Sequence, residues 1–250
     1  MTEPPDDASA AIGSAAPAHG DRRAPLRGLS SMAMRHALAD LIAVDQATSA
    51  RRTVIEATGG VDALRRVRDG EAFDFVVLAD DAIARLADAG RIDPARRVPL
   101  ARSAIAVAVP AGAARPSVAT EADVRAMLTA ARAVGYSTGP SGTHLARLLA
   151  RWGLADALAE RLVQAPPGIP VATLLARREV EVGVQQLGEL MHVPDVDILG
   201  TLPEAIQDIT IFAGAVCTAA RQPDAAAGLL AFLASPACDA VKRRHGLEPA

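Results

Sequence analysis

The chain contains 250 residues, of which 50% are hydrophobic and 22% charged, and its formal net charge is −3. This composition is typical of a globular protein with a substantial core, and it excludes collagen, coiled-coil and wholly disordered chains. The near-neutral charge and the 2% aromatic content argue against nucleic acid as a partner. No stretch reaches the roughly 20 uninterrupted apolar residues that membrane insertion requires.

Residues 1–25 are rich in alanine, proline, glycine and aspartate, and we predict that they form a disordered tail. They contain no basic segment followed by an apolar core, which a secretory signal peptide requires. We therefore expect a cytoplasmic location, or a periplasmic one if the N-terminus has been trimmed.

Predicted strands and helices alternate from residue 26 onward. In the first half, apolar strands are expected at residues 26–30, 52–57 and 73–78. The intervening segments carry apolar residues at three- and four-residue spacing, as amphipathic helices do. The run at 73–78 (FDFVVL) is typical of a strand buried on both faces of a parallel sheet. Successive strand–helix units of this kind predict a doubly wound α/β fold.

The second half repeats this alternation. A strand at residues 104–109 ends at Pro110, and the segment 110–117, rich in proline, glycine and alanine, is a candidate crossing between two lobes. Further strands are expected near residues 133–137, 162–164, 181–185, 196–199 and 209–216, and a last helix over residues 225–244. The single lysine, Lys242, falls in a charged run near the end of that helix, so we expect no lysine inside the core.

Four of the turns after predicted strands are rich in small polar residues. They are Ser30-Ser31-Met32, Thr58-Gly59-Gly60, STGPSGT (residues 137–143) and Gln185-Gln186. Open α/β sheets bind ligands at the carboxyl ends of their strands, where helix N-termini offer unpaired N–H groups and a partial positive charge. Each turn taken alone is equally explained as a helix cap or a plain turn.

Taken together, these turns predict a binding site for a small anion that needs no lysine. Serine and threonine hydroxyls donate hydrogen bonds, and glycine lets a ligand approach the backbone closely. The expected binding residues from the four turns are Ser30, Ser31, Gly60, Ser137, Thr138, Ser141 and Gln185.

Arg102 and Ser103 precede the strand at residues 104–109 and extend this set. Arg102 is either a surface charge or a fork that reaches a ligand carboxylate. His144 follows Ser141 by three residues, within the first helical turn. It is either a half-exposed helix histidine or an acid or base beside the anion.

Motifs for other chemistries are missing. The histidines are scattered without metal-ligand spacing, and the two cysteines, Cys217 and Cys238, are expected to be small buried hydrophobes. We therefore predict neither a metal nor a cofactor. The sequence contains no Walker loop, dinucleotide fingerprint or nucleophile elbow.

Several segments in order resemble the molybdate-binding proteins of bacterial ABC uptake systems. They are Ser30-Ser31 at the end of a strand, FDFVVLADDAIARLADAGRI (73–92), SAIAVAVP (103–110) and LLAFLASPACDAVKRRHGLEP (229–249). The resemblance implies the type II periplasmic-binding-protein fold, with two α/β lobes and an anion held in the cleft between them. Lobe I would comprise residues 26–108 and 209–250, lobe II residues 109–208, and crossings would lie near 104–110 and 209–216.

The phrases SSMAMRHALADL, GGVDALRRVRDGEAFDFVVLA, GYSTGPSG and QAPPGIPV are similar to the bacterial aconitate isomerases of this family. Glycines and glutamines replace the serines and the tyrosine of the molybdate site, which suits a larger, planar ligand with several carboxylates. The resemblance implies isomerisation of cis- and trans-aconitate by an allylic proton shift, with donors for the developing charge and a base. His144, His36, Glu56 and Asp80 are the open candidates for that base.

Two other functions stay open at this point. The first is a binding protein for molybdate or a similar small anion, which would serve an ABC transporter and meet its permease only if exported. The second is a ligand-sensing module that presents its bound state to a partner. No basic patch supports binding to nucleic acid.

Overall fold

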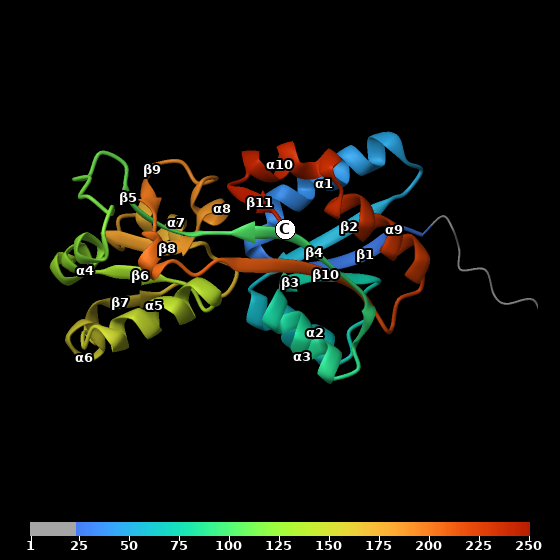
Figure 1. Ribbon diagram of the computed structural model, residues 1–250, viewed down its shortest axis with the longest axis horizontal. Helices are drawn as coiled ribbons and strands as arrows, with labels where there is room; N and C mark the ends of the chain where they lie inside the picture. Colours follow the sequence, from blue (N-terminus) through green and yellow to red (C-terminus); the bar gives the residue numbers. More distant parts are fainter. Residues whose placement is uncertain (1–23) are drawn as a thin grey trace, which may run out of the picture.

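The computed structural model describes residues 24–250, which form two α/β lobes lying side by side (Figure 1). Each lobe contains one sheet with helices on both faces, so the predicted fold class is confirmed. The expected N-terminal tail lies outside the described residues, apart from its last two positions.

Lobe I is built on a six-stranded sheet in the order β11-β4-β10-β3-β1-β2. Strands β1, β2 and β3 run parallel, whereas β10 runs antiparallel to both β3 and β4. The strands are β1 (Leu26–Ser31), β2 (Thr53–Thr58), β3 (Phe75–Ala79), β4 (Ile92–Ser103), β10 (Thr210–Cys217) and β11 (Leu247–Pro249). The helices are η1 (Met32–Met34), α1 (Arg35–Thr48), α2 (Gly60–Arg68), α3 (Asp80–Asp88), α9 (Pro223–Ala234), η4 (Pro236–Cys238) and α10 (Asp239–Arg244).

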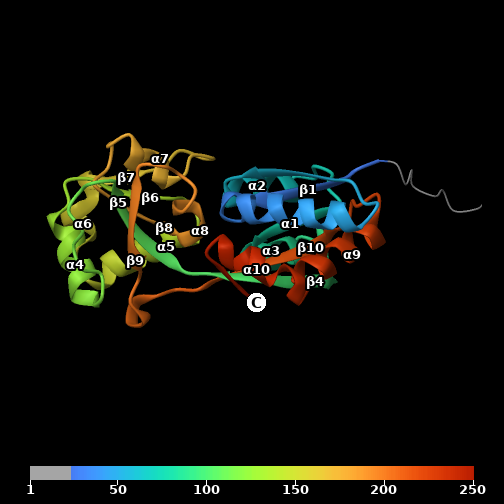
Figure 2. The ribbon, with the colours of Figure 1, turned by 90° about the horizontal axis from the view of Figure 1, so that it is seen from above.

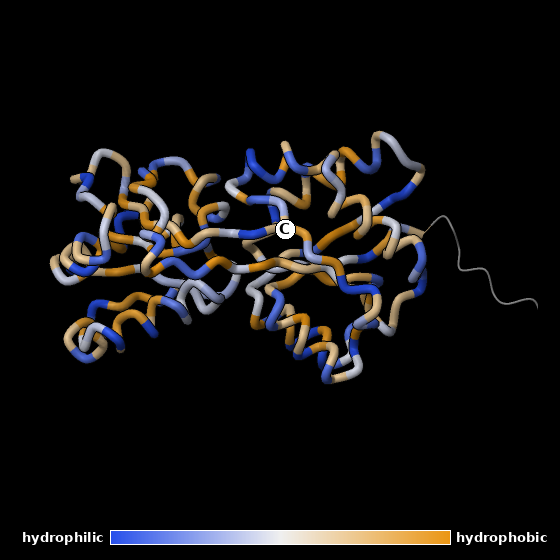
Figure 3. Tube along the Cα trace, viewed as in Figure 1, coloured by the Kyte–Doolittle hydropathy of each residue, from blue (hydrophilic) through white to orange (hydrophobic). Residues whose placement is uncertain are grey.

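Strand β3 shows why this lobe needs helices on both faces. Phe75 and Val77 pack with α1, α9 and α10, while Val76 and Leu78 pack with α2 and α3. All four side chains are fully buried, because successive residues of a strand point to opposite faces. This explains the unbroken apolar run in the sequence. Figure 3 shows hydrophobic and hydrophilic segments alternating along the helices of both lobes.

Lobe II is built on a five-stranded sheet in the order β7-β6-β8-β5-β9. Strands β6, β7 and β8 run parallel, and β5 is antiparallel to β8 and β9. Its strands are β5 (Ile105–Pro110), β6 (Val134–Tyr136), β7 (Leu162–Gln164), β8 (Val182–Gln186) and β9 (Val196–Thr201). Its helices are α4 (Glu121–Ala130), α5 (Pro140–Arg151), α6 (Ala155–Leu158), η2 (Ala159–Arg161), α7 (Val171–Ala176), α8 (Leu187–Leu190) and η3 (Glu204–Ile206).

Two segments of the chain cross between the lobes (Figures 1 and 2). The first passes from β4 to β5 at Ala104, and the second enters β10 after η3. Strand β5 pairs with β8 and β9 and so belongs wholly to lobe II, which corrects the expected lobe boundary after residue 108. Pro110 ends this strand inside lobe II, and the proline- and glycine-rich segment that follows is a surface connection rather than the crossing.

Strand β4 was missed by the sequence reading because charged residues and two prolines interrupt its pattern. It pairs with β10 along most of its length, but with β11 only at residues 101–103. The first part of β4 is therefore a sheet edge, where Pro94 and Pro99 need not donate on both sides.

The sequence predicts one continuous last helix over residues 225–244, but the structure divides it. It ends at Ala234, and α10 resumes after η4 with a bend of 62°. Pro236 lies at the break, since proline cannot donate an intrahelical hydrogen bond. Of the described helices, none is by itself long and apolar enough to cross a membrane, and this bent pair passes that test by length and composition alone.

The single lysine is buried, contrary to the expectation that no lysine lies inside the core. Lys242 lies on α10 with a side chain only 1% exposed, and its Nζ is 3.6 Å from an Asp239 carboxylate oxygen. The charged run in the sequence hid this burial, because one face of α10 packs against the lobe I core while the other carries Arg243 and Arg244 outward.

Candidate functional site

A cleft of about 620 Å³ separates the two lobes and is lined by both. The ends of six parallel strands open into it, β1, β2 and β3 from lobe I and β6, β7 and β8 from lobe II. Gly59 and Gly168 approach each other across it, since a Cβ atom built on Gly59 would lie 3.9 Å from the Gly168 nitrogen. The cleft is thus the point where the strand ends of both sheets converge, and its size suits a small ligand.

The lobe I wall places Ser31 beside Gly60. Ser31 is in register with Thr58 on the neighbouring strand, and a Cβ built on Gly60 would lie 3.8 Å from that of Ser31. Ser31 is buried, and its Oγ has no hydrogen-bond partner in the described part of the chain. Gly60 begins α2, whose first N–H groups no described side chain caps. This wall therefore offers one hydroxyl and several backbone donors.

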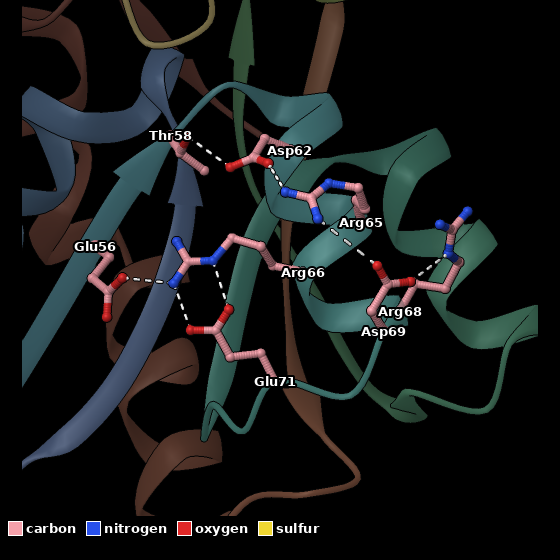
Figure 4. Close-up of polar contacts among 8 residues, drawn as sticks. All are labelled: Glu56, Thr58, Asp62, Arg65, Arg66, Arg68, Asp69 and Glu71. Carbon is pink, nitrogen blue, oxygen red and sulfur yellow. Dashed lines mark hydrogen bonds and ion pairs between the residues drawn. The ribbon is translucent and has the colours of Figure 1, made fainter.

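The turn before α2 is held by a chain of polar contacts (Figure 4). Thr58 Oγ1 donates to Asp62 Oδ2 at 3.1 Å, and Asp62 also pairs with Arg65, whose hydrogen bond lowers the pKa of the Asp62 carboxyl. The Asp62 carboxylate is thereby turned toward its own helix, which leaves the backbone of Gly59 and Gly60 facing the cleft.

The lobe II wall is formed by the start of α5. Ser137 Oγ lies 3.1 Å from Ser141 Oγ and accepts from the Gly139 N–H at 3.3 Å. Thr138 is exposed and lines the cleft beside them. A Cβ on Gly142 would lie only 1.7 Å from the Ser137 carbonyl oxygen, so glycine is required for the turn to pack this closely on its helix.

Two buried glutamines, Gln185 and Gln186, are the last residues of β8 and line the cleft. Gln185 Oε1 accepts from the Val171 N–H at 2.8 Å, and its Nε2 donates to Glu189 Oε1 at 2.9 Å. Gln186 Nε2 donates to Thr210 Oγ1 at 2.8 Å, while its Oε1 is without a partner among residues 24–250. These hydrogen bonds hold the side-chain amides of both glutamines in place at the wall of the cleft.

Glu189 lies four residues after Gln185, on the short helix α8. The residue is partly exposed where it borders the cleft, but the surrounding protein withdraws its carboxyl from bulk water. Burial raises the pKa of Glu189 to about 8, against a smaller lowering by the hydrogen bond from Gln185. Within the described chain, no arginine, lysine or histidine forms an ion pair with it.

The other ionisable groups of the cleft occur as pairs. The Asp80 carboxylate is paired with Arg97, with Nε 2.8 Å from Oδ1. On α3, Arg85 lies 3.3 Å from the Asp81 carboxylate. On the lobe II side, Arg147 lies 2.9 Å from the carboxylate of Asp208. Arg85 and Arg147 thus each place one paired guanidinium at the cleft, one from each lobe.

The structure brings most of the expected binding residues together at the cleft. The six that line it are Ser31, Gly60, Ser137, Thr138, Ser141 and Gln185.

Four expected site residues do not line the cleft. Ser30 points to the opposite face of the strand from Ser31, with Oγ 3.5 Å from the Glu56 carbonyl. Arg102 is exposed on β4, and Ser103 is completely buried beside it. His144 turns away from the cleft, with Nε2 2.7 Å from the Ile206 carbonyl oxygen and Nδ1 3.5 Å from Asp208.

Asp80 and Glu56 were also candidates for the base, and only Asp80 lies at the cleft. Asp80 lines the cleft but is paired with arginine. Glu56 lies outside it, and hydrogen bonds from Arg66 and Arg27 hold the pKa of that carboxyl below its usual range. Figure 4 shows Arg66 between Glu56 and Glu71.

The expectation of scattered histidines is wrong for three of the four described ones. The rings of His36 and His192 lie 4.3 Å apart, and those of His192 and His245 4.8 Å apart. They meet at the boundary between the lobes, outside the cleft. Within residues 24–250 no group of three or more histidine, cysteine or acidic side chains is arranged to hold a metal ion. Cys217 and Cys238 are both buried, and burial raises the pKa of each thiol.

Four ionisable residues of the cleft were not predicted from the sequence: Glu189, Arg85, Arg147 and Asp208. The spacing of four residues between Gln185 and Glu189, directly after a polar turn, was a usable signal for one of them. The pairing of Arg147 with Asp208 joins residues 61 positions apart, and no local pattern reports it.

The sequence matches the family described as bacterial extracellular solute-binding protein over residues 26–248. The chain is 34% identical to an aconitate isomerase of Pseudomonas sp over 184 residues, which cover 74% of this chain and 70% of that protein.

Two solved structures are similar in fold. The periplasmic molybdate-binding protein of Azotobacter vinelandii has a TM-score of 0.75 at 17% identity, covering 89% of this chain and 98% of that one. The sulfate-binding protein of Mycobacterium tuberculosis has a TM-score of 0.72 at 16% identity, covering 90% and 87%. The two lobes therefore form the type II periplasmic-binding-protein fold. Since the family match spans almost all of the described residues, the chain belongs to the bacterial extracellular solute-binding proteins.

Proposed function

We propose that the protein is an isomerase that interconverts cis- and trans-aconitate, or a closely related small polycarboxylate, in the cleft. The observation that carries this proposal is the distribution of donors. Hydroxyls, uncapped helix starts and one arginine face the cleft from each lobe, which suits a ligand with carboxylates at both ends. The relation to an aconitate isomerase supports the same ligand class.

The chemistry asked of the cleft is an allylic proton shift. A proton leaves the methylene carbon, the electron pair of that C–H bond moves toward a carboxylate, and the double bond migrates by one carbon. A proton then adds to the former vinylic carbon. The intermediate carries extra negative charge on a carboxylate, and donors such as Ser31, Thr138 and the Gly60 N–H stabilise it where it develops.

A second function is favoured by the fold. The similar solved structures are named for binding molybdate and sulfate, so the alternative is a binding protein for a small oxyanion that serves an ABC transporter. A cleft of about 620 Å³ is larger than one tetrahedral oxyanion fills, which is why we favour the polycarboxylate.

Proton NMR in D2O tests the proposal directly. The purified protein is incubated with cis-aconitate, and both trans-aconitate and loss of the methylene proton signal are followed. We expect conversion together with deuterium uptake; the absence of both would remove the isomerase function. Calorimetric titrations with molybdate, tungstate and cis-aconitate distinguish the alternative, which requires tight molybdate binding and indifference to aconitate.

A further inference from the structure

We propose that Glu189 is the residue that removes the allylic proton and returns it at the other end of the allyl system. The inference rests on the proposed function, and it names the catalytic base that the sequence left open.

Glu189 differs from the other acids of the cleft in its partners. Asp80, Asp81 and Asp208 each lie within 4 Å of an arginine nitrogen. A cation stabilises the carboxylate and makes it a weaker base. Among the described acids that line the cleft, Glu189 stands alone in having no such partner.

The Glu189 carboxylate is held through one oxygen, which leaves the other available. Gln185 Nε2 binds Oε1 at 2.9 Å, and Gln185 is itself anchored by the Val171 N–H. Glu189 Oε2 accepts no hydrogen bond from any described residue. One oxygen thus orients the group while the other can take a proton.

Helix α8, which carries Glu189, packs closely against lobe I. A Cβ on Gly188 would lie 2.7 Å from the His245 carbonyl oxygen, so this short helix is seated against the C-terminal turn of lobe I. The helix therefore stands where the two lobes meet, and Glu189 lines the cleft that both lobes form. Its raised pKa, about 8, is that of a base strong enough to work near neutral pH.

Glu189 alone accepts the proton and later returns it. Ionised Glu189 takes the methylene proton and becomes a neutral carboxylic acid, while the C–H electron pair enters the dienolate. The same proton, or one exchanged from water, is then delivered to the former vinylic carbon, and Glu189 is ionised again. No oxidant, reductant or metal takes part.

The experiment compares Glu189→Gln with Glu181→Gln, a matched change on the same lobe at a residue that pairs with Arg132 outside the cleft. With Glu189→Gln we expect conversion of cis-aconitate and deuterium uptake to fall by about 100-fold or more. Its affinity for propane-1,2,3-tricarboxylate, the saturated analogue, should stay within about threefold by calorimetry. Glu181→Gln should retain normal conversion.

Two further readouts keep the proposal testable if Glu189→Gln does not fold. In the unaltered protein, conversion should rise with pH along a limb governed by a group of pKa about 8, since the base acts when ionised. Substrate deuterated at the methylene should give product that retains part of the label in H2O, because one residue carries the proton between both carbons. Complete loss of label together with a flat profile would overturn the assignment.

The outcomes also separate the two proposals. If the unaltered protein neither converts nor exchanges cis-aconitate, the isomerase function itself fails. If the unaltered protein converts it and Glu189→Gln converts it at a comparable rate, the function stands and Glu189 is not the base.

Discussion

His245 Nδ1 lies 2.9 Å from His192 Nε2, and this contact joins lobe I to lobe II. His245 follows α10 and also binds Asp40 through Nε2 at 3.0 Å, while His192 follows α8 and stacks near His36. One ring nitrogen must donate and the other accept, so the contact requires at least one neutral ring. Arg35 and Arg244 are the remaining charges near the cluster.

Acidification should therefore destabilise the protein through this cluster. Burial is the main cause that lowers the pKa of His36 and of His192 below the ordinary value of 6.5. As pH falls through and below that value, the unfolded chain takes up protons more readily than the folded one, and stability declines. We expect the melting temperature to drop between pH 7 and pH 5, and His192→Gln to flatten the drop. An equal slope in both proteins would contradict this.

Replacement of Ser31 by alanine should separate binding from stability. The Ser31 hydroxyl is buried without a partner in the described chain, so its removal should leave the melting temperature unchanged or slightly higher. Loss of a donor to a charged ligand should weaken cis-aconitate binding by about 1–3 kcal/mol in calorimetry. Thr138→Ala should weaken binding similarly. Unchanged affinity in both variants would place the ligand elsewhere.

Substitution of Gly142 tests the packing that shapes the lobe II wall. An added methyl group would collide with the Ser137 carbonyl at 1.7 Å, and the turn could accommodate it only by moving. We expect Gly142→Ala to lower the free energy of unfolding by about 2 kcal/mol in urea denaturation. Gly139→Ala is the control, because its methyl group would meet Ser137 Oγ at an ordinary 3.6 Å. Equal stability of the two variants would contradict the prediction.

Asp74 should be essential for the folding of lobe I. This buried carboxylate accepts from the backbone N–H groups of Arg27, Arg221 and Gln222 at 2.7–3.1 Å, so it ties β1 to the start of α9. Asp74→Ala would leave three part-buried backbone donors without their acceptor, and we expect the free energy of unfolding to fall by about 3 kcal/mol. Asp69→Ala, at an exposed position, should change stability by no more than about 0.5 kcal/mol, both measured by urea denaturation.

Several features could be predicted from local sequence because their causes are local. The buried run around Phe75 predicts a strand covered on both faces, and alternating strands and helices predict parallel sheets whose ends face one way. The polar turns at Ser31, Gly60 and Thr138 therefore pointed to one edge of each sheet. The interrupted strand β4 was missed because it depends on pairing with β10, far along the chain. The bend after Ala234 was missed although Pro236 is a local signal for it.

The sequence by itself determined the α/β class, the family resemblance and the small polar turns that meet at the cleft. Only the tertiary structure decided which ionisable groups matter there. His144 was one of four open candidates for the base, but its Nε2 is engaged by the Ile206 carbonyl, whereas Glu189 lines the cleft without a described cation. The physical reason is that the pKa and the partners of a side chain depend on every segment folded around it, and those segments lie far apart in sequence.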